Sequence, residues 1–217
     1  VRGLEDAGAA PGYAANANQI LPAIRTRQTD LGLRWAPVKG TTLILGWFRI
    51  AKPYIDIDQA NRFGVLGSET HEGVEVSLTS KITPLLRVVT GGVWQNPRVE
   101  ASPTIAQPVG RWPVGQNKLR TRFNIEWTLP FARALTLDSY LNYESSAAGT
   151  VDNLVISPGT ARLGIGARYK FKLAGKDVTA RAQLFNVFDS YFAVPFGSGV
   201  YGYNTKRNAQ FWITTEF

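Results

Sequence analysis

The chain has 217 residues and a formal net charge of +8, with 6 Trp, 8 Tyr and 11 Phe but no Cys or Met. Its mean hydropathy of −0.11 is too polar for a helical membrane protein, and no stretch approaches the roughly 18 to 20 apolar residues of a transmembrane helix. One histidine and no cysteine argue against a zinc site or a nucleophile–histidine pair, so we expect no metal site and no enzyme. The basic residues do not gather in an arm or on a helix, which argues against nucleic acid as a partner.

Nine segments alternate apolar and polar residues with a period of two, which predicts β-strands. In chain order they are residues 28–35, 42–50, 71–80, 85–95, 118–129, 135–144, 162–173, 178–188 and 208–217. Their lengths are close to the roughly 9 to 11 residues that a tilted membrane-spanning strand needs. The pattern is typical of a transmembrane β-barrel, in which alternation keeps the average hydropathy near that of a soluble protein.

Segment 118–129 alternates most clearly, with Ile125 and Trp127 on one face and its basic residues on the other. Burying that charged face in a dry core would carry a large desolvation cost for each ion. A strand with lipid on one side and a wet lumen on the other avoids this cost, and segment 162–173 repeats the pattern. We expect lipid-facing side chains at Phe123, Ile125, Trp127, Leu163, Ile165 and Tyr169. We expect lumen-facing side chains at Arg120, Arg122, Arg162 and Arg168.

The connections between these segments alternate in length, as in outer-membrane barrels with short periplasmic turns and long extracellular loops. Residues 36–41, 81–84, 130–134 and 174–177 are short connections, and residues 51–70, 96–115, 145–160 and 189–207 are long ones. Bacterial single-chain barrels have an even number of strands, whereas nine is odd. We therefore expect the whole chain, residues 1–217, to be the C-terminal portion of a larger, all-β, antiparallel up-and-down barrel, with residues 1–27 leading in as an extracellular loop.

The two ends of the chain carry further expectations. The chain begins at Val1 without a methionine, a basic leader or an apolar leader segment, which predicts a processed product or a fragment. The last segment ends on the aromatic residue Phe217. A strand that closes a membrane barrel must stay paired up to the lipid boundary, where an aromatic side chain is favourable. Residues 208–217 are therefore expected to be a closing strand.

Five motifs and the terminal aromatic resemble the TonB-dependent outer-membrane receptors, in particular their ferric-siderophore group. In chain order the motifs are ANANQILPAI (15–24), RQTDLGLR (27–34), WFRIAKP (47–53), HEGVE (71–75) and FNVFD (185–189). In the second motif, Asp30 and Arg34 replace the Glu and Lys of the family pattern.

The resemblance implies a barrel of ~22 strands with a plug domain in its lumen. It also implies an outer-membrane receptor, monomeric as a full-length protein, that takes up a ferric siderophore with energy from the TonB complex. The iron belongs to the bound cargo, so no cofactor is implied. The barrel assembly machinery and outer-membrane lipid are further implied partners. The plug, the TonB box and roughly the first thirteen strands would lie outside residues 1–217.

Aromatic and cationic residues near the expected outer mouth are the ligand-binding candidates, since arginine can pair with an anionic chelate and aromatic rings can stack on aryl groups. They are Arg111, Trp112, Tyr143, Tyr191, Tyr201 and Tyr203. For any one of them alone, loop packing or a place in an interfacial girdle is the stronger interpretation. For the four lumenal arginines, pairing with acidic groups of a plug is favoured over attraction of anionic ligands.

Other functions remain open at this stage. The alternatives are a passive porin or a surface adhesin, and TonB-dependent uptake of cobalamin or a saccharide. An outer-membrane hydrolase is disfavoured, because His71 and Ser77 are about 20 Å apart along an extended strand. Asp56 and Asp58 lack the glycine and terminal glutamate of an EF-hand loop and are expected in a solvated loop.

Overall fold

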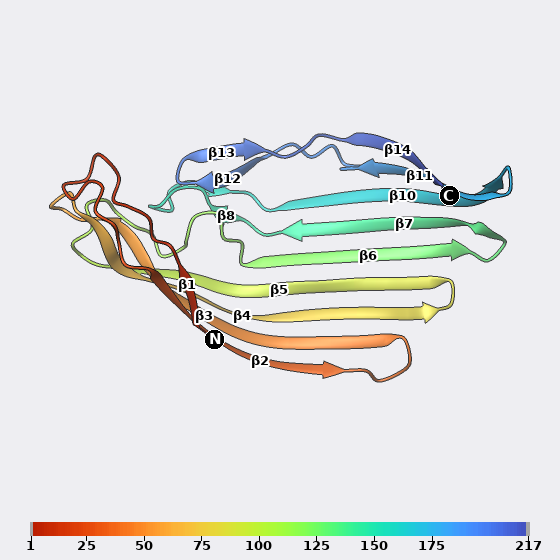
Figure 1. The fold of residues 1–217 in the computed structure, drawn as a ribbon, viewed down its shortest axis with the longest axis horizontal. Helices are drawn as coiled ribbons and strands as arrows, with labels where there is room; N and C mark the ends of the chain where they lie inside the picture. Colours follow the sequence, from red (N-terminus) through yellow and green to blue (C-terminus); the bar gives the residue numbers. More distant parts are fainter. Residues whose placement is uncertain (1, 216–217) are drawn as a thin grey trace.

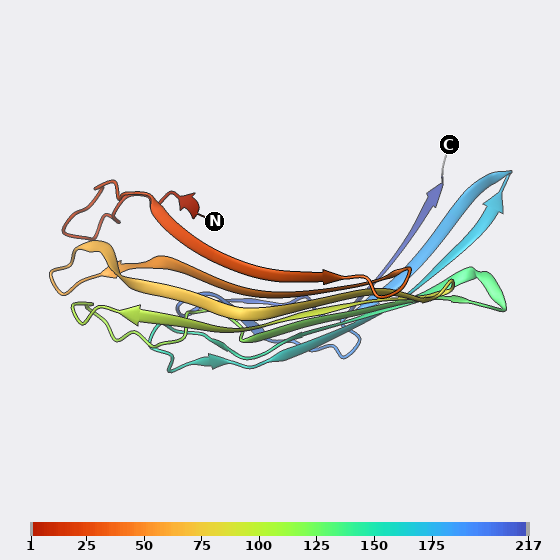
Figure 2. The same cartoon turned by 90° about the horizontal axis from the view of Figure 1, so that it is seen from below.

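The computed structural model describes residues 2–215, and it consists of one curved antiparallel sheet with loops gathered at one end (Figures 1 and 2). The sheet has ten strands, each hydrogen-bonded to its neighbours in the order β1-β2-β3-β4-β5-β6-β7-β10-β11-β14. They are β1 (Arg2–Glu5), β2 (Ile24–Trp35), β3 (Thr41–Ile57), β4 (Phe63–Thr83), β5 (Leu86–Ala101), β6 (Leu119–Leu129), β7 (Ala132–Glu144), β10 (Thr160–Leu173), β11 (Lys176–Phe185) and β14 (Asn208–Thr215).

Two small hairpins stand apart from this sheet. Strands β8 (Ala147–Ala148) and β9 (Ile156–Ser157) form one, and β12 (Ala193–Gly197) and β13 (Val200–Tyr203) form the other. No helix in the described part of the chain is long and apolar enough to cross a membrane.

The nine predicted strands are all confirmed, but the expectation that residues 1–27 form a loop is wrong at both of its ends. Arg2–Glu5 is a tenth strand, and β2 begins at Ile24. The two strands pair from Arg2↔Arg27 to Glu5↔Ile24. A four-residue strand has no alternation to detect, and its pairing depends on a partner about twenty residues away. The expectations for Val1 and Phe217 concern residues outside the described range.

Strands β3, β4 and β5 are longer than predicted, with 17, 21 and 16 residues. Most of the expected loop 51–70 is therefore hairpin, because pairing continues to Ile57↔Phe63. The remaining turn closes on Asp58, whose Oδ1 accepts hydrogen bonds from the backbone N–H groups of Ala60 (2.9 Å) and Arg62 (2.8 Å). The sheet thus extends well beyond the length that a membrane crossing requires.

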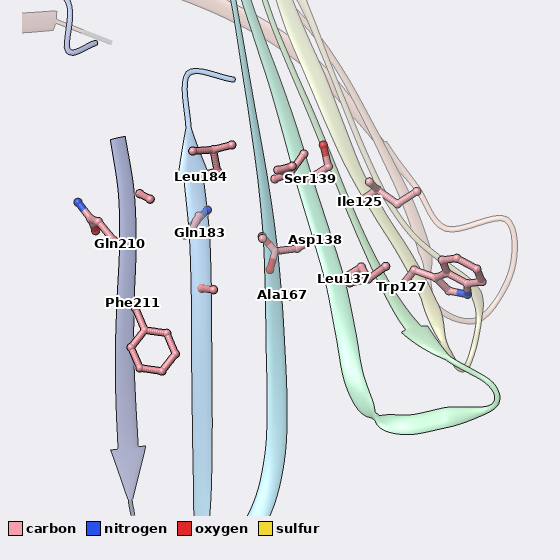
Figure 3. A pocket seen from close by; sticks show the side chains of 14 residues that line it. Ile125, Trp127, Leu137, Asp138, Ser139, Ala167, Gln183, Leu184, Gln210 and Phe211 are labelled. Atoms are coloured by element: carbon pink, nitrogen blue, oxygen red, sulfur yellow. The ribbon is translucent and has the colours of Figure 1, made fainter. Parts of the chain in front are cut away.

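The sheet has one apolar and one polar face, as the alternation predicts. Two neighbouring rows across five strands are Ile125–Ser139–Ile165–Leu184–Ala209 and Trp127–Leu137–Ala167–Ala182–Phe211. In the second row, the small side chains of Ala167 and Ala182 lie between the large ones of Trp127 and Phe211. This difference in size leaves an apolar hollow of about 770 Å³ (Figure 3). The side chains on this face stay exposed, to 43% for Trp127 and 67% for Phe211. The sheet therefore does not bury its apolar face against another layer of the described chain.

On the polar face, small residues make room for long polar side chains. Gly164 and Gly166 of β10 lie under Tyr140 and Asp138 of β7, where an added Cβ would come within 2.1 and 2.7 Å of those side chains. Asp138 can therefore reach across β10 to Arg181 of β11, with a closest N···O distance of 3.5 Å. All four predicted lumenal arginines belong to this face, opposite to Ile125 and Trp127.

Candidate functional site

The loops meet at one end of the sheet, and the short turns lie at the other (Figure 1). Backbone hydrogen bonds join neighbouring loops: Gln59 N–H donates to Thr104 (2.9 Å), Gly110 N–H to Val151 (2.8 Å) and Gly199 N–H to Gly149 (3.0 Å). Several of the few buried apolar residues belong to these loops, namely Ala10, Ala14, Ile105, Ala147 and Ala148. The loops therefore form one packed cluster, which we call the rim.

The last and longest loop of the rim is closed at its base by the FNVFD segment. Asn186 is 5% exposed and has φ of +51°, so β11 ends there and not at the predicted residue 188. Its side-chain amide donates to the carbonyls of Ser190 (2.9 Å) and Thr205 (3.1 Å). Asp189 accepts a hydrogen bond from the backbone N–H of Arg207 (2.8 Å). These bonds clamp the two ends of the loop together.

Above this clamp, Tyr191 and Tyr203 stack with ring centroids 4.9 Å apart and an interplanar angle of 7°. Both rings are exposed, to 53% and 68%. The Lys206 ammonium lies 5.0 Å from the centroid of the Tyr191 ring. The third tyrosine, Tyr201, donates its hydroxyl to the Gly149 carbonyl (3.1 Å) and ties the loop to the β8–β9 hairpin. Lys206 was missed from the sequence because only the fold brings it over the ring.

Trp112 is held within the rim. Its Nε1–H donates to the Gln116 carbonyl (2.7 Å), and its backbone N–H donates to the Asn153 side chain (2.9 Å). The Lys118 ammonium lies 4.5 Å from the indole centroid. Arg111 is next to it with an exposed side chain, while its carbonyl accepts from Val99 N–H (2.9 Å). Trp112 is thus a packing residue of this loop, whereas Arg111 is exposed.

Tyr143 does not join the rim group. It occupies β7 on the same face as Leu137 and Leu141, opposite to Glu144. It pairs across the strands with Thr121 and is 38% exposed. Its position on the apolar face favours the girdle interpretation over ligand contact.

A polar cavity of about 270 Å³ lies between the extended β3–β4 hairpin and the Trp112 loop, with Lys52, Tyr54 and Glu69 in its lining. Glu69 contacts the Lys52 ammonium (3.5 Å) and the His71 imidazole (2.6 Å). Burial alone would raise the pKa of Glu69, but the hydrogen bond from His71 and the charge of Lys52 outweigh it and lower the pKa. Burial and the nearby Asp56 carboxylate raise the pKa of Tyr54. His71 is thus part of a structural ion-pair cluster.

This cluster was missed because residues 51–70 were expected to be loop. The available signal was the polar alternation itself, with Lys52, Tyr54 and Asp56 at every second position. Since these residues extend β3 beyond the predicted span 42–50 toward the rim, the cluster lies at the rim end of the sheet.

The four arginines on the polar face have different partners. Arg120 donates through Nε to Asn117 (3.0 Å), and Arg162 contacts Glu144 (3.8 Å). The Arg122 side chain is exposed. The Nε atom of Arg168 is buried without a hydrogen-bond partner among residues 2–215, as is that of Arg181. A buried donor without a partner is costly, so these two guanidiniums are suited to an acceptor supplied from outside the described chain. No group of three His, Asp or Glu side chains within residues 2–215 could hold a metal ion.

Comparison with solved structures finds the same fold in siderophore receptors. The chain superposes on BauA, described as the ferric preacinetobactin receptor of Acinetobacter baumannii, with a TM-score of 0.84 and 24% identity over 100% of this chain and 33% of that one. It superposes on a Pseudomonas aeruginosa FpvA–pyoverdine–iron complex with a TM-score of 0.76 and 14% identity, over 99% and 30% of the two chains. The Acinetobacter baumannii siderophore receptor PiuA gives a TM-score of 0.72 and 17% identity, over 91% and 29%.

The chain spans about a third of the length of these receptors. A search of curated proteins found no match. The family model described as "TonB dependent receptor-like, beta-barrel" matches residues 3–187, most of the chain. This family consists of outer-membrane receptors and transporters, and the open ten-stranded sheet corresponds to part of its barrel wall. The chain therefore belongs to the TonB-dependent receptor β-barrel family.

Proposed function

We propose that this chain is the C-terminal wall and extracellular rim of a receptor that takes up a ferric siderophore across the outer membrane. The observation that carries the proposal is the exposed Tyr191–Tyr203 stack with Lys206 above it, on a loop clamped at its base. An aromatic and cationic surface of this kind suits an anionic chelate with aryl groups. The solved receptors with the same fold are described as binding ferric siderophores, which supports the same cargo class here.

The clamp contributes by pre-organisation. Because the Asn186 and Asp189 hydrogen bonds close the loop and Tyr201 ties it to β8–β9, the stacked rings are already held before a ligand arrives. A binding surface that is ordered in advance loses less conformational entropy on binding. Arg111 adds an exposed positive charge to the same rim.

On the lumenal side, we propose that the arginines hold a plug domain. Arg168 has a buried donor without a partner in residues 2–215, and Arg122 is exposed on the polar face. Acidic groups of a plug would satisfy both. In this proposal, the energy for transport comes from the TonB complex, as membership of the family implies. The TonB complex would act on the plug and not on this chain.

The test is equilibrium binding of a panel of ferric siderophores to the full-length receptor and to a variant lacking residues 190–206. The deletion should weaken binding of at least one ferric siderophore. Parallel titrations with cobalamin and with oligosaccharides address the alternative cargos. If no ferric siderophore binds and one of those ligands does, the cargo assignment is wrong, although the receptor class stands.

A passive porin or an adhesin makes a different prediction. A porin would show no saturable binding and would conduct small solutes after reconstitution into a bilayer. Saturable binding together with a closed pore supports the receptor.

A further inference from the structure

The apolar face of the sheet changes abruptly to a charged one on β2–β5. One row across the strands is entirely apolar: Leu31–Trp47–Val74–Trp94–Leu119. The next row toward the rim is Thr29–Arg49–Glu72–Asn96, and the one after it contains Arg27, Ala51, Thr70 and Arg98. Successive rows on one face lie about 7 Å apart along a strand, so the change takes place within one row spacing.

The position of the two tryptophans identifies this change as a membrane boundary. Trp47 is next to the charged rows, and Trp94 is exposed to 56% of its surface. Tryptophans of membrane barrels gather at the level of the lipid headgroups, with acyl chains on one side and water on the other. Because the charged rows lie on the side of the long loops, they are level with the headgroups of the outer leaflet.

The charged rows enclose a hollow of about 380 Å³, lined by side chains that include Trp47, Arg49, Thr70, Trp94 and Arg98. Arg27 and Arg98 flank the small residues Ala51 and Thr70 within a single row. Small residues in the middle and long cationic ones around them leave room for a ligand group between the guanidiniums. Arginine is the side chain best suited to such a group when it is a phosphate, because its planar fork binds two oxygens at once.

Two carboxylates line the same hollow and limit its positive charge. Glu72 lies 4.0 Å from Arg49, with both side chains about half exposed, and Glu100 also lines the hollow. An exposed pair at that distance contributes little and is easily exchanged for a better partner. Arg49 is therefore free to turn to a phosphate. The hollow itself is lined by two arginines and two acids, and Arg27 on the neighbouring strand makes the local charge positive.

We propose that this hollow binds the phosphate of an acylated lipid of the outer leaflet, with Arg49 and Arg98 of its lining on the phosphate, Arg27 adding positive charge from the neighbouring strand, and Trp47, Val74 and Trp94 on the acyl chains. The juxtaposition of an apolar row and a cationic row on one face is what selects a lipid over a free anion. The site lies on the outside of the wall, so it is separate from the proposed siderophore surface and rests only on the membrane orientation of the barrel.

The test uses the full-length receptor in a neutral detergent and a fluorescent diphosphoryl lipid A as the probe. The Arg49→Gln/Arg98→Gln variant should bind the probe about tenfold or more weakly, since two charge-assisted hydrogen-bonding groups are lost. The matched control is Arg62→Gln/Arg133→Gln, which removes two exposed arginines, one from a loop tip and one from the start of β7. It should bind like the wild type. Glu72→Gln should bind at least as tightly as the wild type.

Two competition measurements distinguish a lipid phosphate from free inorganic phosphate. Dephosphorylated lipid should not displace the probe, and inorganic phosphate at millimolar concentration should displace little of it. If inorganic phosphate alone displaced the lipid probe, the hollow would be a simple anion site, and the proposal would be overturned. Equal binding by the test and control variants would also overturn it. Siderophore affinity should be unchanged in Arg49→Gln/Arg98→Gln, so failure here is distinguishable from failure of the proposed function.

Discussion

Tyr191 and Tyr203 stack nearly in parallel, with centroids 4.9 Å apart; Tyr191 lies just before β12, and Tyr203 is the last residue of β13. The contact exists because Asn186 and Asp189 close the base of the loop below it. Both rings are exposed, and Lys206 lies over the Tyr191 ring. Packing of the loop alone does not explain why two aromatic rings are held together at the surface.

Replacing either ring should weaken siderophore binding without abolishing it. A contact of this type contributes about 0.5 to 2 kcal/mol, so Tyr191→Ala or Tyr203→Ala should lower the affinity of the full receptor by less than ~30-fold. Tyr143→Ala is the matched control, because Tyr143 lies on the apolar face and should leave affinity unchanged. Isothermal titration would measure all three. An equal loss in the control would show that the effect comes from the fold and not from the rings.

The glycine of the HEGVE motif should tolerate no side chain. A Cβ on Gly73 would lie 2.3 Å from the Trp94 carbonyl oxygen and 2.9 Å from the Gln95 Cα, both backbone atoms. Gly73→Ala must therefore shift the β4–β5 ladder, with a destabilisation of roughly 1 to 3 kcal/mol. Gly64→Ala, where nothing lies within 4 Å of the added carbon, is the control. Urea unfolding of the full receptor should show a lower midpoint for Gly73→Ala only.

The Glu69 cluster should make the rim sensitive to acid. The folded state lowers the pKa of Glu69 below its ordinary value of 4.5, through His71 and Lys52 against the opposing effect of burial. The stabilisation is therefore complete above about pH 4.5 and is lost as the pH falls through the lowered pKa. Glu69→Gln should flatten this part of the stability profile while leaving its shape at higher pH intact. Melting temperatures of the full receptor across pH 3 to 7 would measure it, and a profile with the wild-type acid slope would contradict the assignment.

Spin labels can establish which face meets lipid. A label at position 125 should be accessible to a lipid-soluble quencher, and one at position 122 to a water-soluble quencher, because the two positions lie on opposite faces of β6. The measurement is electron paramagnetic resonance on the full receptor in bilayers. The opposite accessibilities would mean that the arginine face is turned outward.

The lumenal arginines should matter for holding the plug. Arg122→Gln/Arg168→Gln should increase cleavage of the plug by added protease, because each lost charge-assisted bond contributes about 1.5 to 3 kcal/mol. Arg133→Gln, which changes an exposed arginine at the start of β7, should not. If the plug of the double variant stays as protected as in the wild type, these side chains have another role.

The sequence determined the strands of the wall and their two faces. Alternation with a period of two is a local property, and it located β6 and β10 within two residues of their observed bounds. It also separated Arg122 from Ile125, since neighbouring positions on a strand must point to opposite sides. The alternation of short and long connections likewise distinguished the turn end from the rim end.

The tertiary structure decided the rest, because it depends on partners distant in the chain. Strand β1 exists only by pairing with β2, and the β3–β4 hairpin extends through residues that read as loop. Lys206 lies over Tyr191, and Lys118 over Trp112, only once the loops have folded. Tyr143 is a different case, because alternation with Leu137 and Leu141 already placed it on the apolar face, and its pairing with Thr121 agrees with that register. Alternation encodes which way a side chain points from its own strand, whereas a binding surface needs side chains from several loops in one place.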